Sequence, residues 1–228
     1  MVDWLDLACY QSLHFATRQE VMLIMTWSGA RMTGNELVSR YPYEWRSATG
    51  HPFLEAIRDG SLPGAAFRVW LQQDYVFVAD LLRFQATLLS IAPRGGQDAL
   101  AAGLAALESE LGWFEQQAEH MQLPLGVKRH RVTEAYRQRL LSYADDWTSG
   151  ITALWTGERA YLESWSGVAP SAPAYHEFVE HWTQPDFREY VRELETLVDA
   201  SGGDEEAFLA VCKLEQDFWE MAWNSARD

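Results

Sequence analysis

The chain is poor in cysteine and in long apolar runs. Its two cysteines, Cys9 and Cys212, stand far apart and form neither a C-x-x-C pair nor the Cys/His spacing of a zinc site, so we expect no disulfide framework and no metal site. The longest apolar run, residues 21–25, is far shorter than the roughly 20 residues of a transmembrane helix. Acidic residues before this run also argue against a secretory signal. The sequence therefore predicts a reduced, cytoplasmic protein that spans no membrane.

Basic residues are scarce as well. The 228-residue chain carries 18 Lys and Arg against 33 Asp and Glu, which gives a formal net charge of -15. This surface charge repels nucleic acid and anionic lipid, so neither is an expected partner. At 48% hydrophobic residues, with 11 Trp, 9 Tyr and 10 Phe, the composition is typical of one large, well-packed domain.

Several catalytic signatures are missing. The sequence has no glycine-rich phosphate loop and no G-x-S-x-G turn, so nucleotide-binding and serine-hydrolase folds are not supported. No His follows a Glu at the E-x-x-H spacing of di-iron bundles, which makes a di-iron oxidase a remote alternative. The run HEFVEHW, residues 176–182, could bind a metal, but charged pairs at this spacing are ordinary on exposed helices. We expect neither a metal nor another cofactor.

Apolar residues recur at helical spacing and no segment alternates with the period of a strand, so the sequence predicts an all-α fold. Pro93, Gly95 and Gly96 are expected to end one long helix. Residues 1–31 lack a helical stripe and are expected to be an extension of uncertain status, with the domain covering 32–228. The expected helices are 35–49, 52–59, 63–91, 97–121, 132–143, 148–165, 172–182, 185–199 and 204–226.

Acidic residues interrupt the apolar stripes of three expected helices. Asp74, Glu158 and Glu215 each occupy a core-facing position, and Glu110 is a weaker fourth case. An ionised carboxylate that is buried without a partner costs several kcal/mol or more, so these acids either pair with cations or line a cavity. The nearby cations mostly lie off the apolar stripes, which favours the cavity. Such a pocket suits a flat, nitrogen-rich or cationic small molecule.

Aromatic residues accompany these acids, although aromatics at helical spacing usually belong to the core. Phe77, Tyr161 and Phe218 lie one turn from an acid and have the best claim to face a ligand. Tyr136, on a stripe of its own, and Phe114, near Glu110, are further candidates.

Two blocks resemble the TenA/thiaminase II family. HPFLEAIRDGSLPGAAFRVWLQQDYVFVADLLR, residues 51–83, is similar to the family's opening pattern of HPF, a DG-x-LP turn and a QD-Y helix. LEQDFWEMAW, residues 214–223, resembles its C-terminal block, in which a Glu precedes an aromatic pair. The resemblance spans about residues 36–225. It implies a heme-oxygenase-like helical bundle without heme, assembled as a homo-oligomer (dimer or tetramer), that acts on aminopyrimidines of thiamin metabolism.

The resemblance also assigns site residues. The family's pocket acids correspond to Asp74 and Glu215, and Phe218 matches its pocket aromatic. The thiaminase II branch has a nucleophilic cysteine where this chain reads ALWTGERAYLESW, residues 153–165, with Glu158 and no cysteine. This segment, like ELGWF at 110–114, resembles the cysteine-less branch. Phe77 stands where the family has a tyrosine, and Tyr136 matches the family's other pocket tyrosine to within one or two positions.

The expected function is hydrolysis of aminomethylpyrimidine, a thiamin breakdown product, to hydroxymethylpyrimidine in thiamin salvage. Asp74 would orient the ring, while Glu215 and Glu158 would divide the acid and base steps. A covalent role for Glu158 is a further option. The alternatives are hydrolysis of an N-formyl-aminopyrimidine in the same pocket, and a non-catalytic ligand-binding or regulatory protein.

Overall fold

The computed structural model describes residues 31–225, in which Met32 begins a compact helical unit. The expected extension 1–31 lies, except for Arg31, outside the described residues, so its status stays a prediction. Within the described range every regular element is helical apart from an isolated bridge between Met32 and Gly203. The predicted all-α fold is confirmed.

The two longest of the described helices are α5 (Gly64–Ile91) and α6 (Arg94–His120). None of the described helices is both long and apolar enough to cross a bilayer. The remaining elements are α2 (Gly34–Arg40), α3 (Pro42–Thr49), α4 (Pro52–Asp59), α7 (Arg131–Tyr143), α8 (Trp147–Gly167), the 3-10 turn η1 (Pro173–Tyr175), α9 (His176–His181), α10 (Pro185–Ser201) and α11 (Glu205–Asn224).

Two expected helices are broken in the structure. The expected helix 35–49 is divided into α2 and α3 at Tyr41, because a residue before proline avoids helical angles and Pro42 opens the new helix. The expected helix 172–182 begins as the 3-10 turn η1 and becomes α-helical only in α9.

The long helix α5 ends at Ile91 as predicted, but Gly95 and Gly96 do not form the turn that follows it. The two glycines lie in the first turn of α6. A Cβ atom on Gly96 would lie 2.9 Å from the Trp147 ring. Gly96 is therefore explained by the close approach of Trp147 and not by a turn.

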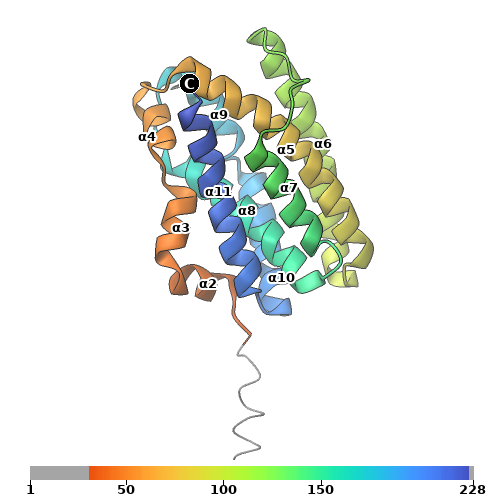
Figure 1. Cartoon of the computed structure of the whole chain (residues 1–228). Helices are drawn as coiled ribbons and strands as arrows, with labels where there is room; N and C mark the ends of the chain where they lie inside the picture. The colour runs from red at the N-terminus through yellow and green to blue at the C-terminus, as the bar shows by residue number, and fades with distance from the viewer. Residues whose placement is uncertain (1–30, 226–228) are drawn as a thin grey trace, which may run out of the picture. The chain divides into compact units, whose positions relative to one another are not determined.

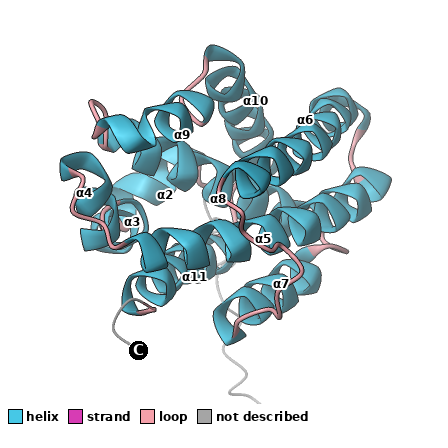
Figure 2. Ribbon diagram, turned by 90° about the horizontal axis from the view of Figure 1, so that it is seen from above, coloured by secondary structure: helices cyan, strands magenta, loops and turns pink. Residues whose placement is uncertain are grey.

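Helix α8 lies at the centre of the bundle and packs against α3, α5, α7, α10 and α11 (Figures 1 and 2). Because neighbours surround it, a run of consecutive residues from Gly150 to Thr156 is buried where a surface helix would bury one stripe. Helix α5 packs between α6 and α7 and also contacts α11. The acidic positions of α5, α8 and α11 consequently face a shared interior.

Candidate active site

One cavity between the helices brings the four predicted acids together. Asp74 of α5, Glu110 of α6, Glu158 of α8 and Glu215 of α11 all line it. The centres of water molecules can occupy about 40 Å³ of its interior, so the cavity admits water. The predicted aromatic residues Phe77, Tyr136 and Tyr161 also line the cavity, and leucine, valine and alanine side chains complete much of its wall.

Phe114 and Phe218 are not among the lining residues, although both were expected to face a ligand. Phe114 is fully buried, and its ring centroid lies 6.0 Å from that of Trp182. The ring centroid of Phe218 lies 5.9 Å from that of Phe77. Both rings therefore pack behind residues that line the cavity.

Asp74 is held by a tyrosine from the central helix. The Tyr161 hydroxyl donates a hydrogen bond to Oδ2 of Asp74. Burial raises the pKa of this carboxyl well above its usual range, the hydrogen bond from Tyr161 opposes that shift, and the charges of Glu110 and Glu215 add to it. No side chain of the described part donates to Oδ1, so this oxygen is available to a ligand.

Glu215 has a similar arrangement with a different tyrosine. The Tyr136 hydroxyl donates to Glu215 Oε1 at 2.6 Å. Burial raises the pKa of Glu215 to about 7, and the hydrogen bond from Tyr136 limits the rise. Gly157 makes room for this pair, because a Cβ atom there would lie 3.1 Å from the Tyr136 hydroxyl.

Glu110 is bonded to a residue that the sequence analysis missed. The indole N–H of Trp182 donates to Glu110 Oε1 at 2.7 Å. Burial raises the pKa of Glu110 to about 7, and this hydrogen bond opposes the shift. Trp182 also packs edge-on against Tyr161, with ring centroids 5.3 Å apart. Trp182 directly follows α9, and it continues a buried apolar stripe with Tyr175, Phe178 and Val179, so helical periodicity could have marked it as an inward-facing residue.

Glu158 differs from the other three acids. No group in the described range 31–225 donates a hydrogen bond to its carboxyl group, which nevertheless lines the cavity. Burial raises its pKa to about 8, and the charges of Glu110, Glu215 and Asp74 contribute in that order. Glu158 is therefore the acid whose hydrogen bonds are left for a ligand or water.

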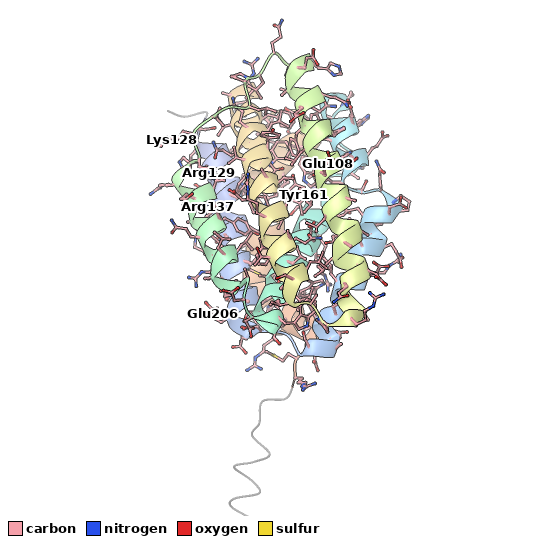
Figure 3. All side chains as sticks on the ribbon, turned by 90° about the vertical axis from the view of Figure 1, so that its right-hand side faces the viewer. Glu108, Lys128, Arg129, Arg137, Tyr161 and Glu206 are labelled. Atoms are coloured by element: carbon pink, nitrogen blue, oxygen red, sulfur yellow. The ribbon has the colours of Figure 1, made fainter. Side chains whose placement is uncertain are left out.

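The nearby cations pair elsewhere, as their positions off the apolar stripes indicated. Arg83 pairs with Asp80, Arg159 with Glu163 and Glu195, and Lys213 with Asp217. In Figure 3, Arg137 lies on α7 and Lys128 and Arg129 lie on the segment that leads into it, whereas Tyr161 of α8 is seen through the gap between the ribbons of α5 and α6. Among residues 31–225 the cavity acids have no cationic partner within salt-bridge distance.

The run HEFVEHW does not form a metal site. Its Glu177 accepts a hydrogen bond from Gln117 at 2.6 Å, and its His181 ring stacks on Trp113 with centroids 3.9 Å apart. Within the described part of the chain, no group of three or more His, Cys, Asp or Glu has an arrangement that could hold a metal ion.

The fold and the cavity define an all-α bundle with a small, acid-lined site for a small molecule. Residues 41–225 match the model of the TENA/THI-4/PQQC family, to which this chain therefore belongs. A probable bifunctional TENA-E protein of Glycine max is 30% identical over 200 residues, covering 78% of this chain and 87% of that protein. An aminopyrimidine aminohydrolase of Halalkalibacterium halodurans is 24% identical over 206 residues, covering 79% and 90%.

The solved structures agree with this membership. A TenA homologue from Pyrococcus furiosus superposes with a TM-score of 0.78 at 30% identity, covering 84% of this chain and 100% of that one. The TenA-like helical bundle is therefore the fold of this protein.

Proposed function

We propose that this protein is an aminopyrimidine aminohydrolase of thiamin salvage, of the branch that uses glutamate in place of cysteine. It would convert aminomethylpyrimidine and water to hydroxymethylpyrimidine and ammonia. The observation that carries this proposal is the free carboxyl group of Glu158, which faces a cavity where the other acids are each held by an aromatic donor. The aminohydrolase among the relatives supports the choice of reaction.

Asp74 would bind the ring. An aminopyrimidine offers an amino donor beside a ring-nitrogen acceptor, and a carboxyl group matches both atoms when one proton is shared between the partners. Burial raises the pKa of Asp74 well above its usual range, which favours the protonated carboxyl group that such a shared proton requires. Tyr161 fixes the orientation of the carboxyl group, while Phe77 and Tyr136 supply aromatic wall, with ring centroids 4.5 Å apart.

Glu158 and Glu215 would divide the proton transfers. The higher pKa, about 8, suits Glu158 as the acid that gives its proton to the departing amine. Glu215, with a pKa of about 7 and a hydrogen bond from Tyr136, is more readily ionised and would take a proton from the attacking water. The C–N bond breaks with its electron pair on nitrogen, and the new C–O bond forms at the methylene carbon.

A substrate has to reach the cavity through a part of its wall that faces the outside. Phe187, at the start of α10, belongs both to this wall and to an open groove outside it. We place substrate entry there.

The test is turnover of aminomethylpyrimidine by Glu158→Gln and Glu215→Gln. Each variant is expected to lose roughly a hundredfold or more in kcat, the usual scale of an acid or base contribution, while ligand affinity changes much less. Glu108→Gln, an exposed change on α6, serves as the control and keeps parental turnover. Parental kcat in Glu158→Gln would show that this carboxyl group has no part in the reaction.

Hydrolysis of an N-formyl-aminopyrimidine is a second candidate. The groove outside the cavity offers about 760 Å³ to water centres and shares Trp182 and Phe187 with the inner wall, so a substituent on the amine has space there. Assaying both pyrimidines with the parent separates the reactions, and binding without turnover of either supports a ligand-binding protein. The expected homo-oligomer is tested by light scattering.

A further inference from the structure

The outer groove touches the inner cavity at a single boundary. Glu110, Trp182 and Phe187 line both spaces. Trp182 and Phe187 carry no group that exchanges a proton near neutral pH, so Glu110 is the titratable residue of this boundary. Its Oε1 accepts the indole N–H of Trp182.

After one turnover of the proposed reaction, Glu158 and Glu215 have exchanged their protonation states. Glu158 has given one proton to the amine and is ionised, while Glu215 has taken one from water and is protonated. Ammonia, a stronger base than either carboxylate, takes the proton from Glu215 and leaves as ammonium with the alcohol, so the next cycle needs one proton returned to Glu158. Because ammonium carries a proton out of the cavity, the proton that replaces it on Glu158 must cross the cavity wall.

Glu110 is well placed for that transfer. Glu110 and Glu158 line the same cavity, and the charge of Glu110 is, after burial, the largest cause that raises the pKa of Glu158. The cavity admits water, which can bridge two such groups. A carboxyl group can accept a proton on one oxygen and donate from the other, whereas a glutamine cannot.

We propose that Glu110 is the proton relay between the solvent-filled groove and Glu158. The role of this relay in turnover rests on the proposed function. Glu110 does not contact the reacting atoms. It acts through Glu158, and we therefore class it as a positioning residue and not as a catalytic one. Each transfer is a proton moving from water in the groove to Glu110, and from Glu110 to Glu158, with no change of oxidation state.

Several titratable residues surround Glu110 and affect its protonation. Asp74 on α5 and Glu158 with Tyr161 on α8 face it from the cavity. The groove adds His181 on α9 and, on α10, Asp186, Glu189, Tyr190 and Glu193. Burial lowers the pKa of His181 to about 4, so this ring is neutral near neutral pH. Arg159 on α8 and Arg188 and Arg192 on α10 are not among the residues that line the cavity or the groove.

The first experiment measures proton exchange and does not depend on knowing the substrate. The protonated carboxyl band of Glu158 is identified in the infrared spectrum by its loss in Glu158→Gln, and its shift is followed after the parent is mixed with D2O. Glu110→Gln is expected to slow this exchange by about tenfold or more. Glu193→Gln, which removes an exposed acid from the same groove, is the matched control and exchanges at the parental rate.

A second variant guards against a purely structural effect. Glu110→Ala leaves a gap at the boundary, and added formate, a small carboxylic acid, is expected to restore exchange in this variant and to have no effect on Glu110→Gln. In turnover, Glu110→Gln should lower kcat with little change in the dissociation constant of the pyrimidine, and the loss should be larger in D2O.

The outcomes are distinct. Exchange at the parental rate in Glu110→Gln overturns the relay, even if turnover falls, since the loss would then reflect structure alone. A failure of formate to restore exchange in Glu110→Ala also overturns it. If the parent does not hydrolyse any aminopyrimidine, the proposed function fails, and slow exchange in Glu110→Gln still supports the relay.

Discussion

The hydroxyl group of Tyr136 donates a hydrogen bond to Oε1 of Glu215 at 2.6 Å and joins α7 to α11 inside the bundle. Both side chains are buried, with 2% and 6% of their surfaces exposed. Burial raises the pKa of Glu215 to about 7, and the tyrosine donor stabilises the ionised form against that shift. The pair therefore holds Glu215 near the protonation balance that a base needs at neutral pH.

Tyr136→Phe is expected to raise the pKa of Glu215 above about 7, because the opposing hydrogen bond is lost while burial remains. The acidic limb of the kcat/KM profile should move to higher pH, and turnover at neutral pH should fall by about tenfold. Tyr143→Phe is a matched control, since Tyr143 on the same helix donates to Glu206 at 2.6 Å but does not line the cavity. An unmoved limb in Tyr136→Phe would exclude Glu215 as the group that titrates there.

Asp74→Asn is expected to weaken binding of the pyrimidine by about tenfold or more, on the scale of one lost hydrogen bond. Oδ2 accepts from Tyr161, so the amide oxygen of the variant would stay on that side and its NH₂ group would replace Oδ1. A donor would then face the amino group of the ligand. Calorimetric titration measures the affinity, with Glu108→Gln as the control. Unchanged affinity would show that Oδ1 does not meet the amino group.

The raised pKa of Glu158 makes the stability of the fold depend on pH. The folded state holds a proton on this carboxyl group up to about pH 8, whereas the unfolded chain loses it near 4.5. Between these values the folded state binds more protons, so its stability falls as the pH rises and this contribution is lost through about pH 8. The Tm of the parent should therefore fall between about pH 6 and about pH 9.

Glu158→Gln should show a smaller fall, and at about pH 9 it should melt above the parent because no buried charge forms there. Glu215 and Glu110, with pKa values of about 7, act in the same direction and preserve part of the dependence. Scanning calorimetry at both pH values checks this. If Glu158→Gln melts markedly below the parent at both, the carboxyl group stabilises the fold through a partner.

Thiol alkylation is expected to leave turnover unchanged. Cys212 has 1% of its surface exposed, and burial raises the pKa of its thiol, so it forms little reactive thiolate. It is not among the residues that line the cavity. Cys9 lies outside the described residues, and Cys9→Ser shows whether any effect comes from it. Loss of activity on treating Cys9→Ser with iodoacetamide would mean that Cys212 is needed for the reaction.

The sequence by itself determined the helices and the acids. Periodicity located α4 at its observed bounds and the long helices to within a few residues, because an apolar stripe is a local pattern along one helix. The same pattern exposed Asp74, Glu158 and Glu215 as acids among core positions. The break at Tyr41 was missed although Pro42 was visible, because the helical stripe continued across it.

Only the tertiary structure decided which groups meet. Tyr161 holds Asp74, Tyr136 holds Glu215 and Trp182 holds Glu110, and each pair comes from different helices or from a loop. The free carboxyl group of Glu158 follows from the same packing, as does the position of Phe114 and Phe218 behind the wall. A stripe shows that a side chain points inward, but the partner it meets depends on how distant helices pack, and one helix does not encode that.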